Sequence, residues 1–267
     1  MSNSYLHREE APFGAGVWER VDAAVTGIAK ARLAGRRLLE VDGPHGYALT
    51  VAGACEFDGE EGGARIRVRR NQPASGIECP FTLGVADIAV FEQTGQPLDL
   101  VSAARAAAAC ADREDDLVFY GSKKLGLTGL INGPGVQSVA LTPWKAVGSA
   151  MDNVLLAVDK LDAAGFHGPY ALALSPVLYN RLFRLFPQTG CSELEQLRQA
   201  VTGGVVKAPA LNGAGVLVTA VREVAAILIG QDLETAFVGP TGRDYEFVVA
   251  ETLALQLKEP SSVCVLK

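Results

Sequence analysis

Apolar residues recur along this chain with two different periods, and the period changes from one segment to the next. A spacing of three and four residues predicts helices, whereas strict alternation predicts strands. Helical spacing begins at Val17 and is expected to end at Gly35, where Arg36 and Arg37 suit the negative end of a helix dipole. The apolar stripe of this first helix comprises Val17, Val21, Ala24, Val25 and Ile28.

Two longer helices are expected further along the chain. Alanine, the best helix former, dominates Asp99 to Gly121. Thr142 and Pro143 suit the N-cap and the first turn of a helix that stops at Gly165. Shorter helices are expected over 176–185 and 193–201, and strands over 205–207, 215–221, 225–229, 245–250, 252–258 and 263–266. Helices and strands interleave without a regular βαβ rhythm, which predicts the α+β fold class.

A charged hairpin is predicted between the first two helices. Residues 47–57 and 64–70 form its strands, and 58–63 form its tip. Its charged residues are Glu56, Asp58, Glu60, Glu61, Arg65, Arg67, Arg69 and Arg70. Acidic residues on one strand and the tip face arginines on the other, so cross-strand neutralisation explains this pattern better than a nucleic-acid patch. A two-stranded ribbon is only marginally stable alone, and we expect it to lie against another subunit.

Composition narrows the class of protein. The 267 residues are 49% hydrophobic and 20% charged, which is typical of a folded domain, and the net charge of −6 argues against general binding to nucleic acid or anionic membranes. The five cysteines form no CxxC pair, so free thiols in a reducing cytoplasm are expected. No signal peptide and no apolar run of membrane-spanning length is found, so a cytoplasmic protein without membrane contact is expected.

A search for catalytic chemistry yields no candidate residues. The chain has no GxGxxG, Walker, GxSxG or HExxH motif, and its three histidines lie far apart, so neither a catalytic site nor a metal site is predicted. The charged run Asp112 to Asp116 could hold a cation. Five successive charges wrap around a helix, however, and are expected to form a solvated surface with i, i+4 pairs. We therefore expect a structural or binding role and no enzyme activity.

Short motifs in a fixed order carry a family resemblance over nearly the whole chain. They are Ala11-Pro12 with Trp18, Leu33 to Arg37, Val41 to Tyr47, Pro80 to Leu83, Glu114-Asp115 with Phe119 to Gly121, Gly126 to Leu130, Gly168 to Leu172, Gly230 to Leu233, and Glu251-Thr252. Together they resemble the encapsulin shell proteins, the linocin-like bacterial nanocompartments. The resemblance implies the fold of tailed-phage major capsid proteins and self-assembly of identical copies, typically sixty, into an icosahedral shell around cargo enzymes.

The resemblance also implies a division of the chain. Residues 1–46 would begin the peripheral domain, 47–83 form an extended loop, 84–135 carry the spine helix, 136–222 form the axial domain, and 223–267 return to the peripheral domain. Asp58, Glu60, Glu61, Arg65, Arg67 and Arg69 would then make intersubunit contacts. The lining of the five-fold pore would be Gln188, Thr189, Gly190, Cys191 and Ser192.

Cargo in this family binds the inner wall through a C-terminal targeting peptide. The positions implied for that groove are Leu33, Arg36, Glu40 and Asp232. Typical cargoes are ferritin-like proteins, dye-decolourising peroxidases and hemerythrin-like proteins, which points to iron storage, mineralisation or defence against oxidative stress. Some relatives hold a flavin against a tryptophan, but Ala86 stands at that position, so no flavin cofactor is expected. The alternatives are a prophage major capsid protein enclosing nucleic acid, or a small oligomeric enzyme or bacteriocin-type protein.

Overall fold

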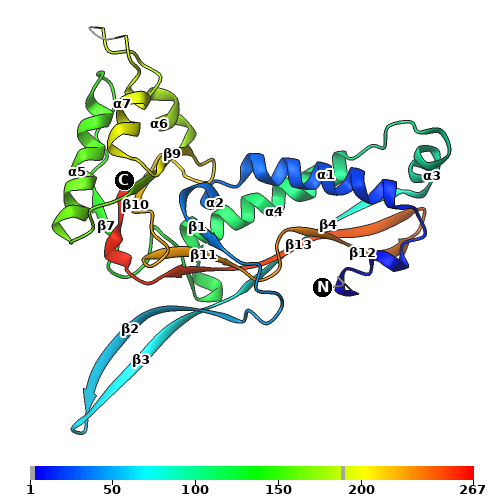
Figure 1. Cartoon of the computed structure of the whole chain (residues 1–267), viewed down its shortest axis with the longest axis horizontal. Helices are drawn as coiled ribbons and strands as arrows, with labels where there is room; N and C mark the ends of the chain where they lie inside the picture. The colour runs from blue at the N-terminus through cyan, green and yellow to red at the C-terminus, as the bar shows by residue number, and fades with distance from the viewer. Residues whose placement is uncertain (1–3, 188–189) are drawn as a thin grey trace.

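Two lobes and a projecting ribbon make up the chain (Figure 1). The computed structural model describes residues 4–187 and 190–267, without the side chains of 4, 54–58, 61 and 66–70. The helices are α1 (Ala15–Arg32), α2 (Gly35–Leu38), α3 (Val85–Thr94), α4 (Val101–Tyr120), α5 (Ser149–Ala163), α6 (Pro176–Arg181) and α7 (Glu193–Ala200), with 3-10 turns η1 (Ser4–Leu6), η2 (Arg8–Glu10), η3 (Lys123–Leu125) and η4 (Pro260–Ser262). The strands are β1 (Glu40–Asp42), β2 (Val51–Glu61), β3 (Ala64–Pro73), β4 (Ser75–Gly84), β5 (Gly121–Ser122), β6 (Leu127–Thr128), β7 (Gln137–Val139), β8 (Tyr170–Leu174), β9 (Gly204–Lys207), β10 (Gly215–Thr219), β11 (Ala225–Ile229), β12 (Glu234–Thr241), β13 (Asp244–Leu257) and β14 (Val263–Leu266).

The sheet of the elongated lobe is built around β13. This strand pairs with β11 and β12 along one edge and with β4 along the other, while β1 joins β11 in parallel. The sequence predicted two strands, 245–250 and 252–258, and that prediction is wrong because β13 runs through without a break. Glu251, which interrupts the apolar pattern, is a buried strand residue and not a turn.

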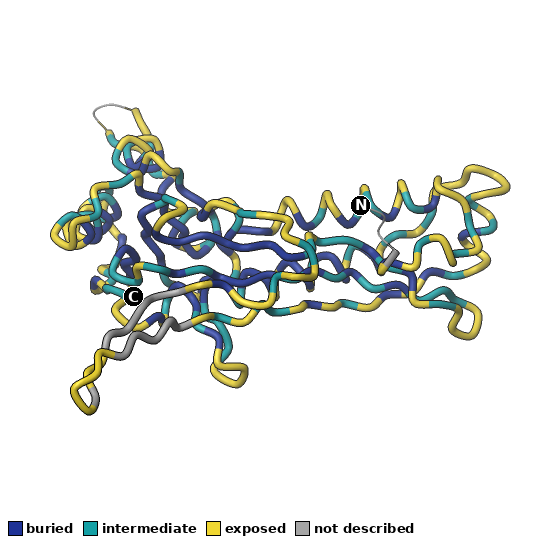
Figure 2. Tube along the Cα trace, turned by 60° about the horizontal axis from the view of Figure 1, so that its bottom comes forward, coloured by how far each residue is buried: buried dark blue, intermediate teal, exposed yellow. Residues whose placement is uncertain are grey.

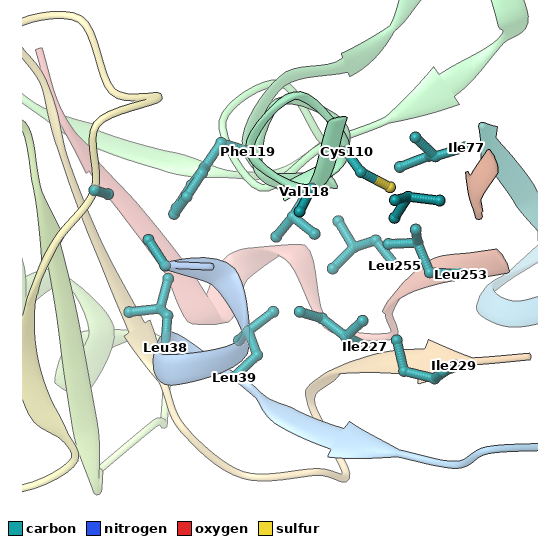
Figure 3. Close-up of a cluster of buried hydrophobic side chains, with 14 of the residues drawn as sticks. Leu38, Leu39, Ile77, Cys110, Val118, Phe119, Ile227, Ile229, Leu253 and Leu255 are labelled. Carbon is teal, nitrogen blue, oxygen red and sulfur yellow. The ribbon is translucent and has the colours of Figure 1, made fainter. Parts of the chain in front are cut away.

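Helices α1 and α4 pack against one another and cover one face of this sheet (Figure 1). In α1 the buried residues recur every four positions, as Val17, Val21, Val25 and Ala29. The predicted alanine-rich helix is confirmed as α4, whose small buried side chains let neighbouring backbones approach closely. Figure 3 shows this core, where Cys110, Val118 and Phe119 of α4 lie near Leu253 and Leu255 of β13 and Ile227 of β11.

The second lobe is built on the sheet β7-β14-β10-β8-β9. Helix α5 packs on β7, β14 and β10, and α6 packs on β8 and β9. Alternate residues of β8 face different cores: Ala171 and Ala173 join the core of the elongated lobe, whereas Leu172 and Leu174 join the core beneath the helices. The sheet is therefore shared between two hydrophobic cores, which joins the lobes without a linker.

The strands of the structure end or pair differently from two of the expected segments. The ribbon was expected over 47–83, but its strands end at Pro73, and Ser75–Gly84 forms β4 at an edge of the first sheet. The segment 223–267 was expected to return to the peripheral domain, as β11, β12 and β13 do if the elongated lobe is that domain. Its last strand, β14, instead pairs with β10 and β7 in the second sheet.

The helix predicted from Thr142 begins later than expected. Helix α5 starts at Ser149, and the residues before it are not helical. Asn153 in α5 fixes the segment that precedes the helix. Its Oδ1 accepts hydrogen bonds from Thr142 N and from Trp144 Nε1, both at 3.1 Å. These side-chain bonds compete with continuation of the helix, so the threonine–proline pair does not start it.

The ribbon β2–β3 extends beyond both lobes, and Figure 2 shows its tip exposed. Its turn is tighter than predicted, since the strands continue to Glu61 and from Ala64. Gly62 and Gly63 make the turn with φ of 59° and 77°. Two successive positive φ values match a type I′ turn, for which glycine is suited because it lacks a Cβ.

Candidate functional site

A buried ion-pair network lies where α2, α4 and β13 meet. The Nη2 of Arg36 donates to Glu114 Oε2 and to Glu251 Oε2, both at 2.7 Å, and its Nη1 donates to Asp232 Oδ1 at 2.6 Å. The Glu114 and Glu251 side chains are 0% exposed, against 17% for Arg36 and 56% for Asp232. One guanidinium thus binds two buried carboxylates and one carboxylate at the surface.

A proton lowers the negative charge of the two buried carboxyl groups. Burial and the neighbouring Glu114 raise the pKa of Glu251 to about 9, against the attraction of Arg36. At neutral pH, Glu251 is therefore protonated, and the two buried carboxyl groups carry one negative charge beside one guanidinium. The Cys110 thiol also donates to Glu251 Oε1 at 3.5 Å. The two buried carboxyl groups and Arg36 balance in charge only while that proton stays in place, and Asp232 adds one further negative charge at the surface.

The charged run 112–116 is not the solvated surface that was expected. Asp112 is exposed, but Glu114 and Asp115 are buried, because successive helix residues point about 100° apart. Asp115 accepts hydrogen bonds from Gly35 N at 2.8 Å and Ala34 N at 2.9 Å. These bonds start α2, so the chain re-enters a helix at Gly35 instead of ending one there, as the sequence had suggested. Burial nevertheless raises the pKa of Asp115 to about 6.

A groove runs between α1 and the start of β12. It has a volume of about 290 Å³ and is lined by Arg8, Asp22, Val25, Thr26, Asp232, Leu233, Glu234 and Thr235. We call its apolar lining residues, Val25 and Leu233, the floor, and its carboxylates, Asp22, Asp232 and Glu234, the acidic rim. Within the chain, Asp22 pairs with Arg8 and Asp232 pairs with Arg36. Arg8 closes one side, donating to Asp22 at 2.7 and 2.8 Å and to Thr235 O at 2.9 Å. An apolar floor with an acidic rim suits a short peptide that carries apolar and basic side chains.

The structure brings three of the four implied groove residues together. Asp232 lines the groove, Arg36 binds Asp232, and Leu33 is buried beneath Leu233 with 5% exposure. Glu40 is exposed on β1, where it pairs with Ala226, and does not line the groove.

Of the eight lining residues, only Asp232 was among the positions implied from the sequence, and the seven missed are Arg8, Asp22, Val25, Thr26, Leu233, Glu234 and Thr235. Asp22 and Thr26 lie four residues apart on the predicted first helix, next to its apolar stripe. Residues at this spacing are neighbours on a helix surface, so the sequence indicates that the two side chains lie together beside the stripe. No such signal exists for Arg8 and Thr235, which come from η2 and β12.

The implied pore loop is partly described. Gln188 and Thr189 lie outside the described residues. Phe186 N donates to Cys191 O and Gly190 N to Phe186 O, both at 2.9 Å, so the described part closes as a turn. Ser192 caps α7 in a capping box with Glu195. Behind the loop, Glu193 is buried and ion-paired with Arg184 at 2.7 Å.

The ribbon has the register that cross-strand neutralisation requires. Its backbone pairing sets Glu56 opposite Arg69, Asp58 opposite Arg67 and Glu60 opposite Arg65. Glu60 and Arg65 are exposed. The side chains of Asp58, Glu61, Arg67 and Arg69 lie outside the description, so their intersubunit contacts stay a prediction.

Sequence comparison decides the family. Residues 2–254 match the Linocin_M18 family, described as "Encapsulating protein for peroxidase". The chain is 34% identical to the type 1 encapsulin shell protein EncA of Myxococcus xanthus, over 98% of this chain and 96% of that protein. The chain belongs to the encapsulin family.

A second relative of this encapsulin is a diheme-cytochrome-encapsulin shell fusion protein from Kuenenia stuttgartiensis. It is 30% identical over 94% of this chain and 72% of the fusion protein. Because these relatives are named for their shell portion, the encapsulin is a structural shell protein and not an enzyme.

Solved structures agree on the fold. The encapsulin superposes on a virus-like particle protein from Pyrococcus furiosus with a TM-score of 0.75 at 20% identity, covering 94% of this chain and 99% of that one. It superposes on the capsid of Myoviridae phage XM1 with a TM-score of 0.60 at 16% identity, covering 87% and 89%. The expected α+β fold of tailed-phage capsid proteins is thereby confirmed.

Neither a metal-binding cluster nor a membrane-spanning helix occurs in the described part of the encapsulin. Within it, no group of three His, Cys, Asp or Glu side chains is arranged to hold a metal ion. No helix there combines the length and apolar character needed to cross a bilayer. Ala86, at the position of the flavin-binding tryptophan of some relatives, is exposed in the first turn of α3.

Proposed function

We propose that sixty copies of this encapsulin close into an icosahedral shell that encloses cargo enzymes. The observation that carries the proposal, beyond family membership, is the ribbon, which extends past both lobes with an exposed tip (Figure 2). Contacts between different surfaces of identical copies form a finite particle when their rotations close. Sixty chains of 28.0 kDa would form a particle of about 1.7 MDa.

The lobes correspond in this proposal to the parts of a capsid subunit. The elongated lobe is the peripheral domain and α4 is its spine helix. The lobe with α5, α6 and α7 is the axial domain, and the ribbon is the extended loop that lies on a neighbour. The shared sheet supports this assignment, because two lobes joined through a common core keep the fixed angle that a regular shell needs.

The groove beside α1 is the proposed docking site for a cargo targeting peptide. Its apolar floor and acidic rim favour a peptide with leucine-like and basic side chains. A single shallow groove binds weakly, but repeated display on an inner wall supplies avidity. The cargo is a ferritin-like protein, a dye-decolourising peroxidase or a hemerythrin-like protein, serving iron storage, mineralisation or defence against oxidative stress. The family description, which names a peroxidase, supports that class.

Exchange with the surroundings would occur at the five-fold pores. The loop 188–192 contains no charged residue, so size and not charge would limit which small solutes enter. The shell functions in the cytoplasm without a flavin, since Ala86 offers no aromatic ring for stacking at that position.

Purification followed by negative-stain microscopy and mass measurement tests the shell. We expect uniform closed particles of about 1.7 MDa with a protein-like ratio of absorbance at 260 and 280 nm. A nucleic-acid ratio in intact particles would favour the prophage capsid alternative. Elution as a small oligomer, with no particles in any buffer, would contradict the proposal.

Neutralising the groove rim is expected to weaken peptide binding. The double variant Asp22→Asn, Asp232→Asn should lower affinity for a labelled targeting peptide by about tenfold at low salt, because two exposed charge pairs contribute about 0.5–1 kcal/mol each. Fluorescence anisotropy with assembled shells measures it. The matched control Asp112→Asn changes an exposed carboxylate of α4 outside the groove. Equal affinity for both variants would place the peptide elsewhere.

Shortening the ribbon is expected to prevent assembly without unfolding the subunit. Removing 59–61 together with 64–66 keeps Gly62-Gly63 as the turn and keeps Asp58 opposite Arg67. The ribbon is expected to stabilise contacts between subunits and not the core, so soluble subunits should replace particles in size-exclusion chromatography while the melting temperature of those subunits stays high. Glu60→Ala is the control for a change at the tip alone. Normal particles from the shortened chain would contradict an intersubunit ribbon.

A further inference from the structure

Two cysteine thiols lie together where α4 packs on β4. Cys110 belongs to α4, and Figure 3 shows its sulfur on the side of the helix that faces Ile77 of β4. Cys79 follows Ile77 by two residues in β4, so both side chains lie on the face of the strand that packs on the core. The Cys79 and Cys110 thiols share a hydrogen bond. The fold thus joins a pair of thiols from two different elements.

The two thiols differ in their access to solvent. Cys110 is fully buried, whereas Cys79 is only partly buried and belongs to a strand at an edge of the sheet. Burial raises the pKa of both thiols, and for Cys79 the hydrogen bond with Cys110 opposes that rise. Both are free thiols in the structure, as the sequence predicts. A reagent that oxidises this pair must therefore be small and must reach Cys79 first.

We propose that Cys79 and Cys110 form a disulfide within one chain, with hydrogen peroxide as the oxidant. In the first step the Cys79 sulfur bonds to one peroxide oxygen, the O–O bond breaks, and the products are a sulfenic acid and water. In the second step the Cys110 sulfur attacks the Cys79 sulfur, and the hydroxyl group leaves with the Cys110 proton as a second water. The two thiols lose two electrons in all, and one peroxide is reduced to two molecules of water.

The bridge fixes α4 to β4 close to the base of the ribbon, since β3 ends at Pro73 and β4 begins at Ser75. It closes the segment 80–109, which contains α3 and the start of α4, and a closed loop restricts the unfolded chain. The bridge also removes the thiol that donates to Glu251. Oxidation therefore stabilises the elongated lobe. Because both thiols belong to one chain, this modification depends on neither the shell nor the cargo groove.

Peptide mapping of the purified full chain, assembled or not, tests the bridge after treatment with hydrogen peroxide. Digestion without reductant should release two peptides linked through Cys79 and Cys110, with a mass about 2 Da below their sum. Cys79→Ser should abolish the linked pair, whereas Cys264→Ser, at a buried cysteine of the second lobe, is the matched control and should retain it. Free thiols at both positions after treatment, or a sulfinic acid on Cys79 without a linked peptide, would overturn the proposal.

Three further measurements separate this bridge from other products of oxidation. The melting temperature should rise by about 4–8 °C and return to its starting value on reduction; a linked chain without that rise would contradict the stabilising role. On a non-reducing gel the treated chain should run as a monomer, and a dimer that requires Cys79 would contradict a bond within one chain. Oxidised glutathione is the control for access, because it is much larger than hydrogen peroxide and should leave the pair reduced. Equally fast bridge formation with both oxidants would contradict oxidation by a small molecule alone.

Discussion

Replacing Arg36 with alanine is expected to lower the free energy of unfolding by about 3–5 kcal/mol. The substitution leaves Glu114 and Glu251, both with 0% exposed side chains, beside each other without their guanidinium. Breaking a buried ion pair on one side costs this much because the remaining charge can neither reach water nor find another partner. Urea unfolding followed by the fluorescence of Trp18 and Trp144 measures the loss.

Arg32 provides a matched control for this prediction. Arg32 lies four residues earlier and is ion-paired with Asp112, but both side chains are about half exposed, at 45% and 53%. Arg32→Ala should therefore cost less than about 1 kcal/mol. If both variants lowered the free energy of unfolding equally, the buried network would contribute no more stability than the exposed Arg32–Asp112 pair. Arg36→Met together with Glu114→Gln and Glu251→Met should recover much of the stability, because it removes the buried charges as a set.

The role of Arg36 also affects how cargo experiments are interpreted. The family resemblance assigned Arg36 to the peptide groove, but its side chain is only 17% exposed and its guanidinium binds three carboxylates of its own chain. Loss of cargo from an Arg36 variant would therefore report a damaged lobe as readily as a lost peptide contact. Asp22 is the better position for testing the groove, since its carboxylate lines the groove and pairs with Arg8, outside the network of Arg36.

The parts of the fold that could be predicted are those in which a single period governs burial. Helix α1 has its buried residues on one stripe, and α4 combines such a stripe with alanine, so both were found from spacing alone. Strand β4 carried an equal signal, with Ile77, Phe81 and Leu83 buried on alternate positions, and was not recognised as a strand. The family was recognised from short motifs that follow one another in a fixed order, and not from catalytic or metal-binding residues.

The buried network could not be predicted, for a physical reason. Arg36 lies 78 residues from Glu114 and 215 residues from Glu251 along the chain. Acidic residues are usually solvated, so local reasoning placed Glu114 and Asp115 on the surface and treated Glu251 as a break between strands. Only the folded topology brings the compensating guanidinium and backbone N–H groups to them. The groove could not be predicted for the same reason, because its lining residues come from η2, α1 and the start of β12, which are far apart along the chain.

Raising the pH is expected to weaken the subunit through Glu251, and Glu251→Gln should remove that effect. Folding raises the pKa of Glu251 from 4.5 to about 9. Between these values the folded state keeps a proton that the unfolded state releases, so the free energy of unfolding falls as the pH rises and levels off above about 9. The contribution of this group to stability is complete below pH 4.5 and falls by at most about 1.4 kcal/mol per pH unit.

Comparison of the native chain with Glu251→Gln isolates this proton from every other titration. The amide donates and accepts like the protonated carboxyl group but cannot ionise, so the variant should match the native chain near pH 5 and exceed its stability increasingly toward pH 9. Asp115, whose pKa rises to about 6, contributes a smaller fall of the same sign in both proteins. Glu78→Gln, at an exposed position of β4, is the control and should follow the native profile. Parallel urea-unfolding profiles for the native chain and Glu251→Gln from pH 5 to 9 would mean that Glu251 is ionised in the folded lobe. Arg36 would then balance two buried negative charges alone, and the destabilisation expected for Arg36→Ala would have to be larger still.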